Sequence, residues 1–202
     1  MDNTEKTTII TDLQGGDPLS RTVTSTLFSC VWGGCKVTIY DLVGGAGWLG
    51  RAMLGSYYTQ SHGLVFVVDL WSIHKSLQDT RVAITDVLQH THIAGKAVLL
   101  LANQQDLSGA LGEVELKHCL SLEKLVNRHQ CRCLIKLCLA VLGSGKTLDK
   151  SISEGVEWLL DYISHDYKAI NERVQMDTAH KRAREEDKRT REDIACLEKE
   201  DR

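Results

Sequence analysis

A side-chain amide and a carboxylate stand three residues apart, directly after an apolar segment. Asn103 and Asp106 follow residues 97–102, which are six apolar residues in a row. A run of this kind, bounded by a lysine and by polar residues, is typical of a strand that is buried on both faces. In open α/β sheets, ligands bind at the carboxyl ends of the strands. Asn103 and Asp106 are therefore candidates for hydrogen bonds to a ligand at that edge.

A second acid occupies a similar place earlier in the chain. Residues 64–68 are apolar, and Asp69 follows them. Between the two segments, apolar residues such as Ile84 and Leu88 recur at helical spacing. A strand, a helix and a strand in this order predict an α/β fold with a mostly parallel sheet flanked by helices.

The first eight residues contain a lysine followed by two threonines. In the phosphate-loop pattern G-x-x-x-x-G-K-[ST], Lys6 would contact the β- and γ-phosphates and Thr7 would bind Mg²⁺. The match is incomplete, because the first glycine would precede residue 1 and Glu5 replaces the second. A polar, disordered N-terminus is the alternative interpretation. Residues 140–147 give another partial match, in which Ala140 replaces the first glycine and a simple glycine turn is the alternative.

Residues 27–31 and 35–40 predict a β-hairpin with a two-glycine turn between its strands. Asp41 ends the second strand, and Gly44 and Gly45 follow it. An acid at this place suits the outer shell of a Mg²⁺ ion, and a backbone N–H of the glycine segment could point at a phosphate. A hairpin strand that ends in a flexible loop is the alternative interpretation of the same residues.

The composition indicates one domain with a tail. A chain of 202 residues is ordinary for this, and its net charge of −3 leaves no basic footprint for nucleic acid. No apolar run is long enough to span a bilayer, and seven scattered cysteines suggest free thiols in a reducing compartment. From residue 166 onward, acids alternate with lysines and arginines, as in an exposed helix or coiled-coil fragment. We expect a domain at residues 1–165 and a charged helical tail at 166–202.

The order of these features resembles the Arf and Arf-like small GTPases, and most closely the thirteen-type ciliary Arf-like proteins, which have a long charged C-terminal helix. The matching segments are residues 37–42, 63–69, 101–106, 109–113 and 119–127. The last segment is more specific to the thirteen-type proteins than the nucleotide motifs are. In the family, a strand precedes the phosphate loop, whereas this sequence begins inside that loop. We therefore expect a small-GTPase (P-loop NTPase) plan that lacks its first strand, with a truncated N-terminus.

The resemblance implies a site for GTP or GDP with Mg²⁺. By position, the residues that would line the nucleotide are Asp2, Asn3, Thr4, Glu5, Lys6, Thr7, Asp41, Gly44, Gly45, Asn103, Gln104, Asp106 and Ala140. Thr7 and Thr22 would bind the metal, Thr22 only when the γ-phosphate is present. Asp41 would lie on the metal side, and the Gly44 N–H would sense the γ-phosphate. Asp106 would accept hydrogen bonds from guanine, and the Ala140 backbone would donate one to the guanine oxygen.

Several residues depart from the family pattern. Glu5 stands where a glycine lets the loop wrap the phosphate, and like charges about 4 Å apart repel by a few kcal/mol at moderate dielectric. Gln104 replaces a lysine that packs along the base, and Leu139 replaces a serine. Gly45 replaces the glutamine that positions the attacking water, so weak or absent hydrolysis is expected. The alternative is therefore a nucleotide-free pseudo-GTPase that acts as a protein-binding scaffold.

The function that the resemblance implies is a guanine-nucleotide switch in cilium assembly and ciliary membrane traffic. In the thirteen-type proteins the GTP form promotes nucleotide exchange on another Arf-like GTPase, so the expected partners are such a GTPase and ciliary traffic proteins. The expected location is the cilium or the cytoplasmic face of membranes, or the cytoplasm if the chain is truncated. Membrane attachment would need a segment that is missing here, and no nucleic-acid partner is expected.

Overall fold

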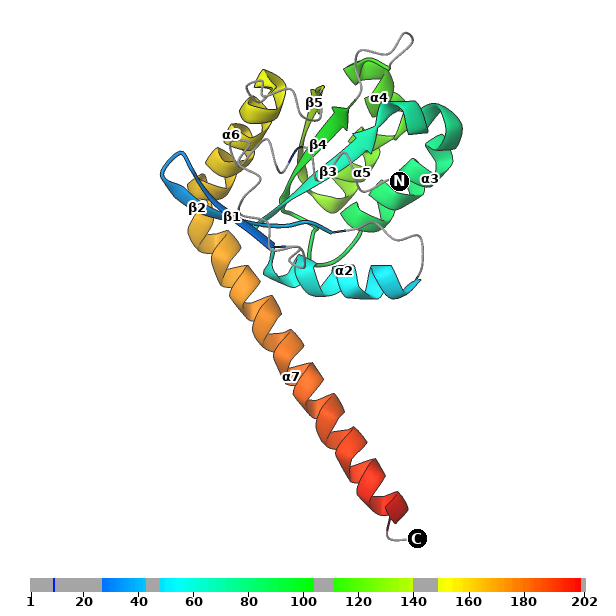
Figure 1. Ribbon diagram of the computed structural model, residues 1–202, viewed down its shortest axis with the longest axis vertical. Helices are drawn as coiled ribbons and strands as arrows, with labels where there is room; N and C mark the ends of the chain where they lie inside the picture. Colours follow the sequence, from blue (N-terminus) through cyan, green and yellow to red (C-terminus); the bar gives the residue numbers. More distant parts are fainter. Residues whose placement is uncertain (1–8, 10–26, 43–47, 104–110, 140–148, 201–202) are drawn as a thin grey trace.

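Helices pack on both sides of a central parallel sheet, and one long helix leads away from the domain (Figure 1). The computed structural model describes residues 9, 27–42, 48–103, 111–139 and 149–200. Within these ranges, every helix is too short or too polar to cross a membrane.

The central sheet has three parallel strands. β3 (Gly63–Asp69) pairs with β4 (Ala97–Asn103), and β4 pairs with β5 (Arg132–Leu137), so the order is β3-β4-β5. Every residue of β4 is buried, as the continuous apolar run predicts. The register places Asp69 opposite Asn103. The two strands therefore end side by side at the carboxyl edge of the sheet.

Both faces of β4 are covered because its side chains alternate between two cores. Val98 and Leu100 belong to one core, which contains residues of α3, α4 and α5. Leu99 and Leu101 belong to the other core, which contains residues of α6. The helices are α3 (Leu70–Leu88), α4 (Glu113–Cys119), α5 (Leu122–His129) and α6 (Lys150–His165). This arrangement confirms the predicted α/β fold with a mostly parallel sheet flanked by helices.

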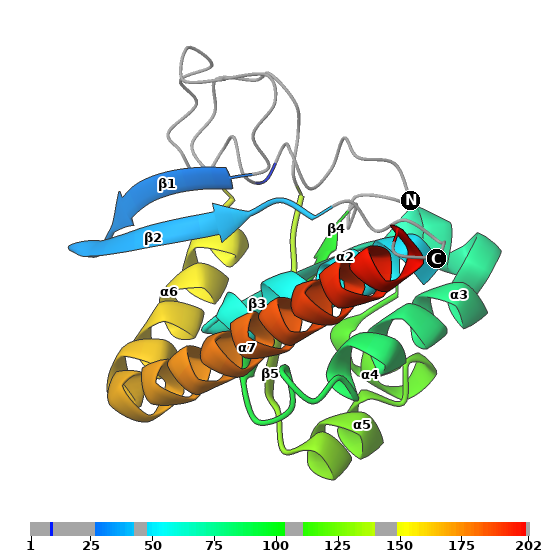
Figure 2. The same cartoon turned by 90° about the horizontal axis from the view of Figure 1, so that it is seen from below.

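The predicted hairpin consists of β1 (Leu27–Trp32) and β2 (Cys35–Tyr40), which pair in antiparallel register. Gly33 and Gly34 have φ angles of +55° and +81°. Two positive φ angles in a two-residue turn are typical of the type I′ turn, which matches the twist of a hairpin and favours glycine. Among the described strands, the hairpin forms a sheet of its own, apart from β3-β4-β5 (Figure 2).

Two further helices complete the described fold. α2 (Trp48–Gln60) precedes β3, and α7 (Tyr167–Glu200) follows α6 after Asp166. α7 has 34 residues, which corresponds to roughly 50 Å at the rise of an α-helix. Its outer part extends beyond the domain, whereas its first turns pack beside α2 (Figures 1 and 2). The boundary between domain and tail at residue 166 stays a prediction.

Candidate functional site

The carboxyl edge of the central sheet brings together polar side chains from neighbouring strands. Asn103 is the last residue of β4 and is only 1% exposed. Asp69, the last residue of β3, lies opposite it and is half-buried. A buried amide at the end of a strand buried on both faces is positioned rigidly, because β4 is paired on both sides. This edge therefore supplies a fixed hydrogen-bonding group beside a carboxylate.

The segment after β5 begins at the same edge of the sheet. The Cys138 N–H donates to the Ala102 carbonyl oxygen at 2.9 Å, so the ladder continues one residue past β5. The Leu139 N–H then donates to Asp149 Oδ2 at 2.9 Å. Residues 139 and 149 are thus tied together next to the end of β4. Ala140, the proposed guanine-oxygen donor, directly follows this point in the sequence.

Asp149 is a positioning residue that the sequence interpretation missed. Its Oδ1 accepts a hydrogen bond from the Ser151 N–H at 2.7 Å, which caps the first turn of α6, while its Oδ2 holds Leu139. An Asp directly before the apolar-periodic residues of α6 is the signal that could have identified it as an N-cap. One carboxylate therefore fixes both the start of α6 and the chain that leaves β5.

Asp41, the predicted metal-side acid, directly follows β2 and is half-buried. Of the predicted site residues, Asp41 and Asn103 are the two within the described ranges. The predicted residues outside those ranges are Asp2, Asn3, Thr4, Glu5, Lys6, Thr7, Thr22, Gly44, Gly45, Gln104, Asp106 and Ala140. Their roles stay predictions, and Asp106 is tied to the edge only by its place three residues after Asn103.

A buried lysine lies at the opposite end of β4. Lys96 is 1% exposed, and its Nζ donates to the carbonyl oxygens of Tyr58 at 2.9 Å and Ser61 at 2.6 Å, where α2 ends. Burial and, to a smaller extent, the nearby Arg173 guanidinium lower the pKa of this ammonium to about 8, although the Asp177 carboxylate opposes the shift. Lys96 therefore joins the end of α2 to the start of the central strand.

The pKa of Lys96 predicts a pH-dependent stability. The pKa of Lys96 is about 8 in the folded chain and takes its usual value of 10.5 in the unfolded chain. Between these two pH values the unfolded chain therefore binds one more proton than the folded chain. The penalty for burying the charge is fully present below pH 8 and is relieved by pH 10.5. Chemical denaturation should show the natural chain gaining up to about 3 kcal/mol relative to Lys96→Met across this window. A difference that is constant from pH 8 to 10.5 would contradict the assignment.

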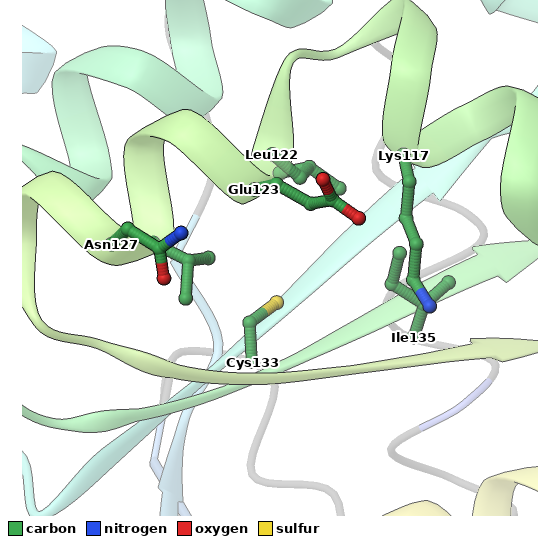
Figure 3. A pocket seen from close by; sticks show the side chains of 7 residues that line it. Lys117, Leu122, Glu123, Asn127, Cys133 and Ile135 are labelled. Atoms are coloured by element: carbon green, nitrogen blue, oxygen red, sulfur yellow. The ribbon is translucent and has the colours of Figure 1, made fainter.

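A small cavity of about 330 Å³ lies away from the carboxyl edge, between α4, α5 and β5 (Figure 3). Its lining residues are Lys117, Leu122, Glu123, Val126, Asn127, Cys133 and Ile135. The Cys133 side chain points toward the α5 residues that line the cavity. Burial raises the pKa of the Cys133 thiol to about 11, so this thiol is protonated at neutral pH and is a poor nucleophile.

Comparison with known proteins decides the family. The model of the ADP-ribosylation factor (Arf) family matches residues 1–163 of this chain. The chain belongs to the Arf family. Among similar Arf-family proteins is ADP-ribosylation factor-like protein 2 of Arabidopsis thaliana, which is 31% identical over 166 residues, 81% of this chain and 84% of the relative. ADP-ribosylation factor-like protein 13B of Chlamydomonas reinhardtii is 27% identical over 87% of this chain, which spans only 32% of that longer relative.

A solved structure in the same family confirms the fold. The Arl6 BBS3 small GTPase from Trypanosoma brucei, solved with the bound nucleotide analogue GppNp, is similar with a TM-score of 0.62 and 26% sequence identity. The similarity covers 82% of this chain and 94% of the Arl6 chain. The small-GTPase plan expected from the sequence is therefore the fold of this Arf-family chain.

Proposed function

We propose that this Arf-family protein is a guanine-nucleotide switch, which binds GTP or GDP with Mg²⁺ at the carboxyl edge of the central sheet. The observation that carries the proposal is Asn103, a buried amide at the end of β4 beside the end of β3. An amide and a following carboxylate suit the edge of a purine, which presents both donors and acceptors. The GppNp-bound Arl6 structure supports the same class of ligand.

The remaining roles follow the family pattern. Asp106 would accept hydrogen bonds from the base, and the Ala140 N–H would donate to the guanine oxygen. The tie between Leu139 and Asp149 supports this second role, because it fixes the chain immediately before Ala140. Bound Mg²⁺ would neutralise charge on the β- and γ-phosphates. The residues that would hold the phosphates and the metal are Asp2, Asn3, Thr4, Lys6, Thr7, Thr22, Asp41 and Gly44.

Hydrolysis by this protein should be weak. Gly45 carries no side chain that could orient an attacking water. Other groups would have to position that water. A slow GTPase keeps its triphosphate state for longer, which suits a switch whose active form must meet a partner.

We further propose a thirteen-type role in cilium assembly and ciliary membrane traffic, in which the GTP form promotes exchange on another Arf-like GTPase. Similarity to the Chlamydomonas 13B protein and the long charged α7 support this assignment. The test is the release of fluorescent GDP from a purified Arf-like GTPase. If the GTP-loaded protein accelerates the release of the fluorescent GDP no more than the GDP-loaded protein does, the exchange role is rejected.

A pseudo-GTPase scaffold is the second candidate, and Glu5 is the residue that favours it. A carboxylate about 4 Å from phosphate oxygens would cost a few kcal/mol, which would weaken nucleotide binding by orders of magnitude. Gln104 stands where other family members have a lysine that packs along the base, so that contact to the base is lost as well.

Fluorescence titration with a GTP analogue and Mg²⁺ separates the two candidates. We expect saturable binding by the natural chain and tighter binding, by about tenfold or more, after Glu5→Gly, because the substitution removes the repulsion. Glu185→Ala, at an exposed position of α7, is the matched control and should leave the affinity unchanged. Binding only after Glu5→Gly would support the scaffold for the natural chain.

A further inference from the structure

The first turns of α7 are attached to the domain at two places. Near the end of α2, His62 Nε2 lies 3.1 Å from Asn171 Oδ1, and the His62 ring stacks on Tyr167 with centroids 5.7 Å apart. One turn further along α7, Val174 is 7% exposed. This part of α7 is therefore packed against the domain, unlike the exposed residues that follow it.

Arg173 makes the second attachment. Its Nη1 donates to the Ala94 carbonyl oxygen at 2.6 Å and its Nη2 donates to the Thr91 carbonyl oxygen at 2.7 Å. A guanidinium that donates to two carbonyls has a fixed orientation. Asp177, one turn later, lies 2.9 Å from His92 Nδ1 and 3.9 Å from Arg173 Nε. Both side chains therefore hold α7 on the segment between α3 and β4.

The same segment leads to the buried lysine that holds α2. Lys96 donates to the last carbonyls of the α2 region, at Tyr58 and Ser61, and its charge interacts with those of Arg173 and Asp177. We call the group of His62, Lys96, Asn171, Arg173 and Asp177 the α2–α7 junction. This junction links the end of α2, the start of β4 and the first turns of α7.

We propose that α7 is a lever coupled to α2 through the α2–α7 junction, so that the direction of the charged tail depends on the nucleotide state. The link to nucleotide rests on the proposed function, because α2 follows Asp41 and Gly44, the proposed sensors of metal and γ-phosphate. Coupling of this kind is reciprocal. The factor by which a nucleotide changes the docking equilibrium of α7 equals the factor by which docking of α7 changes the affinity for that nucleotide. A partner that grips the tail would thereby also act on the nucleotide site.

Amide hydrogen exchange of the full chain tests the coupling within the protein. Arg173→Ala should speed exchange about fivefold or more in residues 167–180 and also in residues 54–60 at the end of α2. Arg184→Ala, at an exposed position further along the same helix, is the matched control and should change neither region. Acceleration in α7 alone, with the end of α2 unchanged, would overturn the proposal.

A milder variant tests the coupling in case Arg173→Ala does not fold. Asn171→Leu removes the hydrogen-bond partner of His62 and leaves Arg173 in place. Circular dichroism shows whether each variant keeps its helices. A folded Asn171→Leu chain should show the same paired acceleration to a smaller degree. If α2 exchange is unchanged in that chain, the coupling is again contradicted.

The nucleotide arm of the test uses GppNp with Mg²⁺. Saturation with GppNp should change exchange in residues 167–180 relative to GDP, and Arg173→Ala should change the ratio of GppNp to GDP affinities by about fivefold. Binding without either change would overturn the link between α7 and the nucleotide. If neither nucleotide binds, the proposed function fails and the nucleotide link fails with it, while the α2–α7 coupling is decided by the unliganded exchange rates.

Discussion

Asp106→Ala is expected to weaken binding of a fluorescent GTP analogue by about 100-fold or more. The carboxylate would accept two hydrogen bonds from guanine, from the ring N1–H and from the exocyclic amine. Hydrogen bonds to a charged group contribute roughly 1.5–3 kcal/mol each, and about 1.4 kcal/mol corresponds to a factor of ten in affinity. The measurement is a fluorescence titration with Mg²⁺ at fixed ionic strength.

The control for this prediction is Asp161→Ala, which removes an exposed carboxylate of α6. It should leave the affinity for the analogue unchanged. Asn103→Ala should also weaken binding, by about tenfold or more, because a buried amide is lost from the same edge. If Asp106→Ala binds as tightly as the natural chain, the carboxylate does not hold the base.

Leu99→Ala is expected to lower the free energy of unfolding by roughly 2–5 kcal/mol. The Leu99 side chain is fully buried in the core between β4 and α6. Its removal leaves a cavity beneath a helix that the closely packed sheet cannot fill by collapsing. Denaturant unfolding measures the loss, and Val114→Ala, which truncates a residue that is 79% exposed, should change stability by less than about 0.5 kcal/mol.

Gly155 of α6 supplies an internal check on the same contact. A Cβ atom added at Gly155 would lie 2.9 Å from Leu99 Cδ1 and 3.2 Å from Leu99 Cδ2. Gly155→Ala should therefore strain the natural core, whereas in the Leu99→Ala chain the two methyl groups are gone and the added methyl partly fills the cavity. A double-mutant cycle should give a favourable coupling of about 1 kcal/mol or more. Additive effects would show that α6 and β4 do not meet at these atoms.

Much of the fold could be predicted because its strands carry local signals. The unbroken apolar run before Asn103 predicts burial on both faces, and the structure shows every residue of β4 buried. The paired glycines at 33 and 34 predict a hairpin turn, and both have positive φ angles. The carboxyl edge could likewise be predicted, because parallel strands connected through helices end on the same side.

The contacts that hold α7 could not be predicted, because they join residues that are far apart in the sequence. The mixed charges after residue 166 are typical of an exposed helix, and most of α7 is exposed. Arg173 nevertheless donates to Ala94, 79 positions earlier in the chain. The burial of Lys96 could not be predicted either, since a lysine directly before an apolar strand is usually exposed to solvent. Its burial depends on the carbonyls of Tyr58 and Ser61 from another element.

The candidate site was predicted mainly through the family resemblance rather than through local structure. Asn103 and Asp41 stand where strands end, and that placement follows from the strand pattern. Asp149 was missed because its second role, holding Leu139, depends on how β5 and α6 meet in space.

The central claim is that a guanine ring lies at the carboxyl edge of β4, and competition binding tests it most directly. A fluorescent GTP analogue bound to the natural chain is titrated with GDP and, separately, with ADP. The predicted result is saturable binding that GDP displaces at concentrations at least about 100 times lower than ADP does, because guanine and adenine present opposite donors and acceptors to Asp106. Equal displacement by the two nucleotides, or no saturable binding by the natural chain, would contradict the claim.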